Sequence, residues 1–85
     1  MKYIEKENIQ LDLILGEEYE ILHGRKTGKK YKTLYFRGVL IQETKDFYVL
    51  RCKHGYCESF LKIDFAIQEY KIRNATTKKY VPVYF

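Results

Sequence analysis

The chain has 85 residues, enough for one small domain with a single core and too few for two. Sixteen basic and eleven acidic residues give a formal net charge of +5, and 46% of the residues are hydrophobic, which excludes a disordered chain. No apolar run approaches the roughly 18 residues of a membrane span and the first residues show no signal-peptide pattern, so we expect a cytoplasmic protein without membrane contact.

The first patterned segment, residues 9–15, lies between Asn8 and Gly16 and has two interpretations. Apolar residues at every second position indicate a strand. Asn8 as a helix N-cap and Gly16 just beyond the end indicate a two-turn helix. The chain is therefore expected to begin with a short N-terminal helix or strand, and we favour the helix.

After Gly16 the pattern becomes that of β-structure. The long run 31–42 has Gly38 in its middle, where a bulge or a sharp bend is the usual reason for a glycine. Residues 43–46 and 63–66 are expected to be turns. The five expected strands are 18–23, 31–42, 47–53, the segment after His54-Gly55, and 67–73.

His54-Gly55 predicts a two-residue hairpin turn, because glycine readily adopts the positive φ that such turns need. This turn pairs Arg51 with Glu58 and Val49 with Phe60. An opposite-charge pair and an aromatic–β-branched pair are favourable cross-strand neighbours, so both support the register.

These elements predict a mostly β fold, a small five-stranded barrel of SH3-like or Sm-like kind whose second strand is strongly bent. One domain is expected over residues 1–85, with a core over 15–73 and an apolar C-terminal extension over 74–85. The aromatic end, residues 80–85, is expected to pack back on the barrel or to join subunits of a homo-oligomer.

The positive charge is concentrated in one part of the chain. Residues 1–20 contain two basic and six acidic side chains, whereas residues 21–41 contain six basic and no acidic ones. Such a block is a solvated loop or a site for phosphate, and the acidic first segment offers an intramolecular alternative. We give an anionic partner more weight, because exposed ion pairs stabilise by only about 0–1 kcal/mol. The candidate anion-binding residues are Arg25, Lys26, Lys29, Lys30, Lys32 and Arg37.

The loop 24–30 lacks the phosphate-binding loop pattern, since three residues rather than four separate its glycines and a strand follows it. Alternation places Tyr31, Tyr35 and Arg37 on one face of their strand, opposite Leu34 and Phe36. Tyrosines beside cations can stack on bases, so Tyr31 and Tyr35 are candidate stacking residues. The alternative is that tyrosine simply favours half-buried strand positions.

The two cysteines are expected to be reduced thiols, although the expected hairpin register places Cys52 opposite Cys57. With His54 they provide three metal ligands where a structural zinc site needs four, and His54 at a turn tip points away from them. We therefore expect no metal and no cofactor.

The sequence gives little support for catalysis. Ser59, the only serine, lies within an expected strand rather than at a nucleophile elbow. No pair of carboxylates has a spacing that assigns acid and base roles. A non-enzymatic protein is expected.

Two resemblances cover about residues 15–73. Leu15-Gly16, the basic loop and the stretch 37–44 with the strand after it resemble the Veg family of small Sm-like proteins of Gram-positive bacteria. The runs 41–49 and 58–65 are similar to small uncharacterised phage and prophage proteins. The first resemblance implies a regulatory or nucleic-acid-associated role and transfers no site residues. The second implies an accessory protein in a bacterial host cell that counters host defence.

The expected function is therefore binding of an anionic ligand, a nucleic acid or a nucleotide signal, through a basic, tyrosine-flanked face. The alternative is a phage inhibitor that binds a host defence protein directly.

Overall fold

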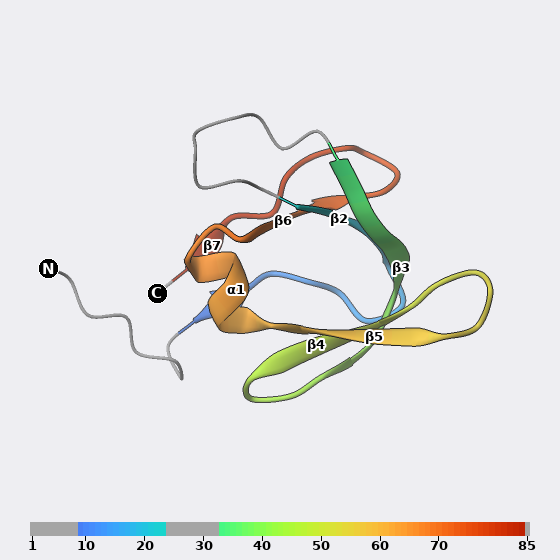
Figure 1. Ribbon diagram of the computed structural model, residues 1–85, viewed down its shortest axis with the longest axis horizontal. Coiled ribbons are helices and arrows are strands. Elements are labelled where there is room, and N and C mark those ends of the chain that lie inside the picture. The colour runs from blue at the N-terminus through green and yellow to red at the C-terminus, as the bar shows by residue number, and fades with distance from the viewer. Residues whose placement is uncertain (1–8, 24–32, 85) are drawn as a thin grey trace, which may run out of the picture.

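The computed structural model describes residues 9–23 and 33–84 (Figure 1). Within these ranges the chain forms seven strands and one short helix. The elements are β1 (Gln10–Leu11), β2 (Glu18–His23), β3 (Thr33–Glu43), β4 (Phe47–Arg51), β5 (Cys57–Leu61), α1 (Lys62–Ala66), β6 (Tyr70–Asn74) and β7 (Val83–Tyr84).

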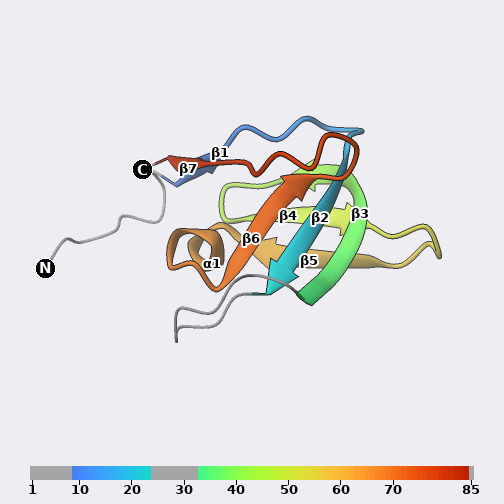
Figure 2. The same ribbon diagram turned by 90° about the horizontal axis from the view of Figure 1, so that it is seen from above.

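The described residues are organised in two antiparallel sheets. The main sheet has the order β5-β4-β3-β2-β6, and β1 pairs with β7 in a second sheet of two strands (Figure 2). The core lies between them and includes Ile21, Leu40 and Leu50, which are almost completely buried. The protein is mostly β, as the sequence predicts.

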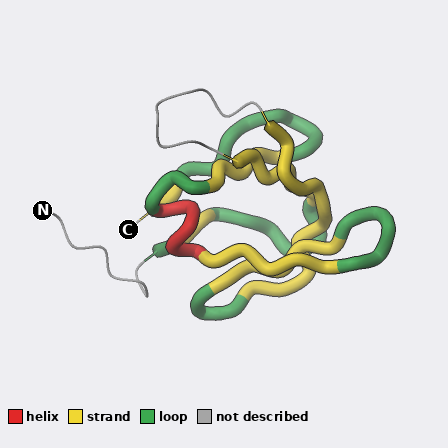
Figure 3. The backbone as a smooth tube through the Cα atoms, in the orientation of Figure 1, coloured by secondary structure: helices red, strands yellow, loops and turns green. Residues whose placement is uncertain are grey.

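The strand β3 is strongly bent and links the two halves of the main sheet, as Figure 3 shows. Residues 33–39 pair with β2 and residues 39–43 pair with β4, and a register shift interrupts each pairing. Gly38 lies between the two shifts, where an added Cβ would stand 2.6 Å from the backbone oxygen of Arg51. The predicted bend in this run is confirmed. Gly38 permits the close approach of β4, whereas the bulges lie on either side of it.

The main sheet does not close into the expected barrel. Its two edge strands, β5 and β6, are not paired with each other among the described residues. Aromatic rings fill the interval instead, since the ring centroids of Phe60 and Tyr70 are 5.7 Å apart and those of Phe65 and Tyr70 are 6.2 Å apart. The opening is therefore bridged by side chains rather than by backbone hydrogen bonds.

The helix favoured for residues 9–15 is wrong. Leu11 lies in β1 opposite Val83, and its N–H and C=O groups both bond to the hydroxyl of Tyr48 at 3.2 Å. Ile9 and Leu11 are buried, whereas Ile14 and Leu15 are exposed. Groups distant in the sequence thus form hydrogen bonds with backbone N–H and C=O groups that a helix would have paired with near neighbours.

The C-terminal extension packs back on the molecule. Val83 and Tyr84 form β7, and Val81 and Val83 pack against the core. The N–H of Val81 donates to the carbonyl of Ile72 at 2.9 Å, which ties this segment to β6.

The predicted hairpin after β4 exists, but its register is wrong by one residue. Arg51 lies opposite Cys57 and Tyr48 lies opposite Phe60. Tyr48 and Phe60 are both buried, so the observed register keeps both rings on the core face, whereas the predicted one pairs Phe60 with Val49 on the other face. The connection accordingly has five residues, 52–56, rather than two.

The segment predicted as the turn 63–66 is the short helix α1, and β6 begins at Tyr70 rather than at residue 67. The N–H of Ile67 donates to the carbonyl of Ile63, which continues the helical pairing, and Gln68 has a φ of 64°. At the start of α1, the buried Lys62 ammonium lies 2.9 Å from the carboxylate of Glu43 and 5.0 Å from the ring centre of Tyr48.

Candidate functional site

Most of the sequence-predicted site residues lie outside the described residues, namely Arg25, Lys26, Lys29, Lys30, Tyr31 and Lys32. In the sequence they stand between His23, which ends β2, and Thr33, which begins β3. The structure describes the two remaining candidates, Tyr35 and Arg37, both on β3.

Tyr35 and Arg37 line the same hollow, which has a volume of about 440 Å³. One side comes from β3 with the first residue of β2, and the other from the loop between β4 and β5. Tyr56 on that loop is 65% exposed and Tyr35 is 49% exposed, so both rings are accessible to a ligand. The lining residues are Glu18, Leu34, Tyr35, Phe36, Arg37, Cys52, Lys53, His54 and Tyr56.

Strict alternation along β3 does not hold at Tyr35. The register shift opposite Ile21 and Leu22 interrupts the alternation there. As a result Tyr35 and Phe36 both approach the ring of Phe60, with centroid distances of 6.1 and 5.6 Å. The expected arrangement, with Tyr35 beside Arg37 and opposite Phe36, is therefore wrong in detail, although all three side chains line the hollow.

Arg37 is paired with two carboxylates of β2. Its Nε and one terminal nitrogen each lie 3.2 Å from an oxygen of Glu18, and the other terminal nitrogen lies 3.6 Å from Glu20. The hydrogen bond and charge of Glu18 raise the pKa of Arg37. The acidic first segment thus neutralises part of the basic block, which is the intramolecular alternative considered above. Because Arg37 and Glu18 are 50% and 39% exposed, a phosphate in the hollow can compete for the guanidinium.

Glu20 is a buried carboxylate that three cations surround. Its side chain is 4% exposed, and its oxygens lie 2.7 Å from the Nε of Arg73 and 3.0 Å from the Nζ of Lys78, in addition to Arg37. Burial raises the pKa of Glu20, but hydrogen bonds from Arg73 and Lys78 outweigh it and hold the pKa below its ordinary value. The carboxylate is therefore ionised and fixes three cationic side chains on the sheet face opposite the core.

Acid is expected to destabilise the protein through Glu20 and Glu43. Burial also raises the pKa of Glu43, and hydrogen bonds from Lys62 and Gln10 outweigh it, so both carboxyls have pKa values below 4.5 in the folded protein. A lowered folded pKa gives stability that is present above the unfolded value and is lost as the pH falls through the folded value. Urea unfolding at decreasing pH should show this loss below about pH 4.5.

The matched variants for this titration are Glu20→Gln and Glu43→Gln. Each should flatten the acid limb of the stability curve, and the double variant should flatten it most. An acid limb unchanged in the double variant would show that other groups cause the loss.

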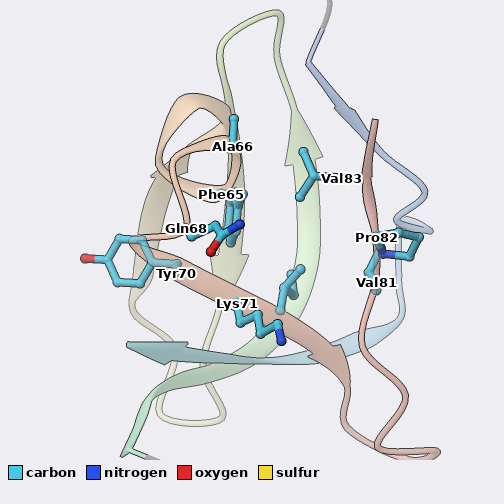
Figure 4. A pocket seen from close by; sticks show the side chains of 9 residues that line it. Phe65, Ala66, Gln68, Tyr70, Lys71, Val81, Pro82 and Val83 are labelled. Carbon is cyan, nitrogen blue, oxygen red and sulfur yellow. The ribbon is translucent and has the colours of Figure 1, made fainter. Parts of the chain in front are cut away.

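A second concavity, an apolar groove of about 290 Å³, lies between α1, β6 and the C-terminal extension (Figure 4). Phe65, Tyr70 and Val83 contribute apolar surface, and Lys71 is the one charged residue in its lining. Sequence reasoning missed this groove, because its three walls come from segments that only the folded chain brings together.

The cysteines are both free thiols, Cys52 buried and Cys57 exposed. The observed hairpin register places Arg51 rather than Cys52 opposite Cys57. Over residues 9–23 and 33–84, no group of three or more His, Cys, Asp or Glu side chains is positioned to hold a metal ion. No helix in the same ranges is long and apolar enough to cross a membrane.

Comparison of the chain with protein-family models, with curated proteins and with solved structures found no match. The candidate sites are the hollow beside β3, with the cationic side chains around it, and the apolar groove.

Proposed function

We propose that this protein is a small non-enzymatic binding protein that engages a phosphate-bearing ligand, nucleic acid or nucleotide, at the hollow between β3 and the β4–β5 loop. The observation that carries the proposal is that one opening combines accessible rings, Tyr35 and Tyr56, with the cations Arg37 and Lys53. Stacking on aromatic rings together with charge pairing to phosphate is the usual basis of such binding.

The charge distribution along the chain supports this proposal. Five basic residues stand between positions 25 and 32, and the chain then enters β3 directly before Leu34 and Tyr35 of the hollow. These basic residues therefore immediately precede, in the chain, the strand β3 that forms one wall of the hollow. A concentration of positive charge attracts polyanions and makes their binding dependent on salt.

At the level of the fold, we propose an opened variant of the SH3-like or Sm-like arrangement. The five-stranded order and the bent strand β3 support it. On this proposal the resemblance to Veg proteins and to phage proteins reflects an accessory role in the cytoplasm of a bacterial host. The fold itself does not specify a ligand.

The test is binding of a fluorescein-labelled oligothymidylate of about twelve nucleotides, followed by fluorescence anisotropy at increasing salt. We expect affinity to fall steeply with salt, and the double variant Lys29→Glu, Lys30→Glu to bind about tenfold more weakly or worse. Tyr56→Ala should also weaken binding by about tenfold, because stacking on one ring contributes about 1–3 kcal/mol.

The matched control uses Lys45 and Lys53, two lysines that flank β4 in the sequence. Lys53→Glu lies in the hollow and should weaken binding, whereas Lys45→Glu makes the same charge change in the β3–β4 turn and should have little effect. Equal effects of the two variants would indicate general electrostatics rather than a site. Salt-independent binding, or no binding of oligonucleotide or nucleotide, would overturn the proposal.

The apolar groove favours a second candidate function, direct binding to a host protein as a phage inhibitor. Its lining residues Phe65, Tyr70 and Val83 are of the kind that anchor protein partners. Recovery of one stoichiometric host protein after nuclease treatment would favour this function. Native mass measured before and after deletion of residues 80–85 would show whether that end also joins copies of the chain into a homo-oligomer.

A further inference from the structure

Four residues form one cross-strand row on the sheet face opposite the core. Glu20 on β2 lies directly opposite Arg37 on β3 and directly opposite Arg73 on β6. Arg73 in turn lies opposite Tyr80 in an isolated bridge. Three strand spacings separate the ends, so the row is about 14 Å long. It begins at the hollow, because Arg37 lines it.

The far end of the row is a second site that combines an aromatic ring with cations. Tyr80 is 44% exposed, the Nζ of Lys71 lies 4.8 Å from its ring centre, and the guanidinium of Arg73 lies 5.8 Å from it. Arg73 also donates to the Tyr80 hydroxyl at 3.5 Å. The ring is thus held beside two cations while part of it stays accessible.

The charge of this surface is positive on balance. Four cations, Arg37, Lys71, Arg73 and Lys78, stand against two carboxylates, Glu18 and Glu20, which leaves a net charge of +2. Glu20 is buried beneath Arg37, Arg73 and Lys78, so it orders these cations and presents little negative charge to solvent. Glu18 is more exposed than Glu20 and closer to Arg37, at 3.2 Å against 3.6 Å, so it is the stronger competitor of a ligand for Arg37.

We propose that the ligand is a single-stranded nucleic acid that lies across this face from the hollow to Tyr80. Bases stack at the two ends, on Tyr35 or Tyr56 and on Tyr80, and phosphates contact Arg37, Arg73 and Lys71 between them. This inference rests on the proposed function and narrows its ligand from any nucleotide to an extended strand. A free nucleotide does not reach both ends of the row, and the paired bases of a duplex are not available to the rings.

The first test is the dependence of affinity on ligand length. Thymidine monophosphate and oligothymidylates of up to about twelve nucleotides are titrated into the full chain by calorimetry. The strand of about twelve nucleotides is also titrated as a duplex with oligoadenylate. Affinity should rise at least tenfold between the monophosphate and a strand of about four to six nucleotides and then level off. Single strand should bind more tightly than duplex.

The second test removes the far end of the row. Tyr80→Ala should weaken binding of the twelve-nucleotide strand by about tenfold and leave binding of the monophosphate unchanged. Tyr80→Phe keeps the ring and should bind almost normally. The control Tyr84→Ala removes a comparably exposed tyrosine of β7 outside the row and should leave both affinities unchanged.

A further variant, Lys71→Gln, guards against a folding defect in Tyr80→Ala, since Lys71 is an exposed side chain of β6. It should lower the slope of log affinity against log salt by about one for the long strand. If Tyr80→Ala and Lys71→Gln have no effect while Lys53→Glu weakens binding, the proposal that the strand extends to Tyr80 is overturned. The proposed binding at the hollow is then retained. Equal affinity for the monophosphate and the long strand, or tighter binding of duplex, also overturns the proposed extension to Tyr80. If neither the monophosphate nor any oligonucleotide binds, the proposed function itself is overturned, and the inference about an extended strand is overturned with it.

Discussion

Gly38→Ala is expected to destabilise the protein by about 3 kcal/mol, at the upper end of the cost of overpacking a core. An added Cβ would lie 2.6 Å from the backbone oxygen of Arg51 and 2.9 Å from the ring of Phe36. Neither neighbour can move freely, because Arg51 is paired with Val39 in the sheet and Phe36 packs against the core. Relief therefore requires β3 and β4 to separate. The smaller entropy of the unfolded chain offsets only about 0.4–1 kcal/mol of this cost.

Denaturant titration gives the free energy of unfolding, and for a domain of this size the loss corresponds to a fall in Tm of about 12–24 °C. The control is Gly55→Ala, which adds the same methyl group in open space at a φ of 98°. It should cost about 1–2 kcal/mol from backbone strain alone. A Gly38→Ala protein as stable as the Gly55→Ala protein would show that β4 accommodates the extra atom.

Elements defined by local pattern could be predicted from the sequence, and choices that depend on distant partners could not. The strand 18–23 and the bent run through Gly38 have alternation and glycine signals within their own residues. The register of the hairpin depends instead on burying Tyr48 and Phe60 on the same face. The sequence favours another register, because that register forms one opposite-charge pair and one aromatic–β-branched pair. Within residues 9–15, Gln10 and Leu11 form a strand because β7, more than 70 positions later, supplies its partner.

The candidate site can be predicted only in part, for the same reason. A basic, tyrosine-containing strand is visible in the sequence and points to Tyr35 and Arg37 as candidates. Lys53 and Tyr56 join them only because the β4–β5 loop folds beside β3. Glu20 has the position of a solvated acid in an alternating strand, yet it is buried, because Arg73 and Lys78 come from segments more than 50 residues away.

Tyr48→Phe is expected to cost about 1–3 kcal/mol, because it leaves the Leu11 N–H without its side-chain acceptor. The Leu11 carbonyl loses the hydroxyl but still accepts from the Leu13 N–H at 2.9 Å. The completely buried Tyr48 hydroxyl accepts from the Leu11 N–H and donates to the Leu11 carbonyl, each at 3.2 Å. These bonds attach β1, and through it β7, to the main sheet. The control Tyr56→Phe removes an exposed hydroxyl and should change stability by less than about 0.5 kcal/mol.

The same hydroxyl predicts a loss of stability in alkali. Burial raises the pKa of Tyr48 from 10.0 to about 12, so folding favours the neutral phenol. The contribution of the Tyr48 phenol to the free energy of unfolding is complete below pH 10. It is lost as the pH rises toward 12, because the unfolded chain has by then already released the phenol proton. Burial raises the pKa of Tyr70 as well, so Tyr48→Phe should reduce the alkaline slope without abolishing it. Urea titrations between pH 9 and pH 12 measure this slope, and an equally steep slope in the Tyr48→Phe protein would assign the transition to other groups.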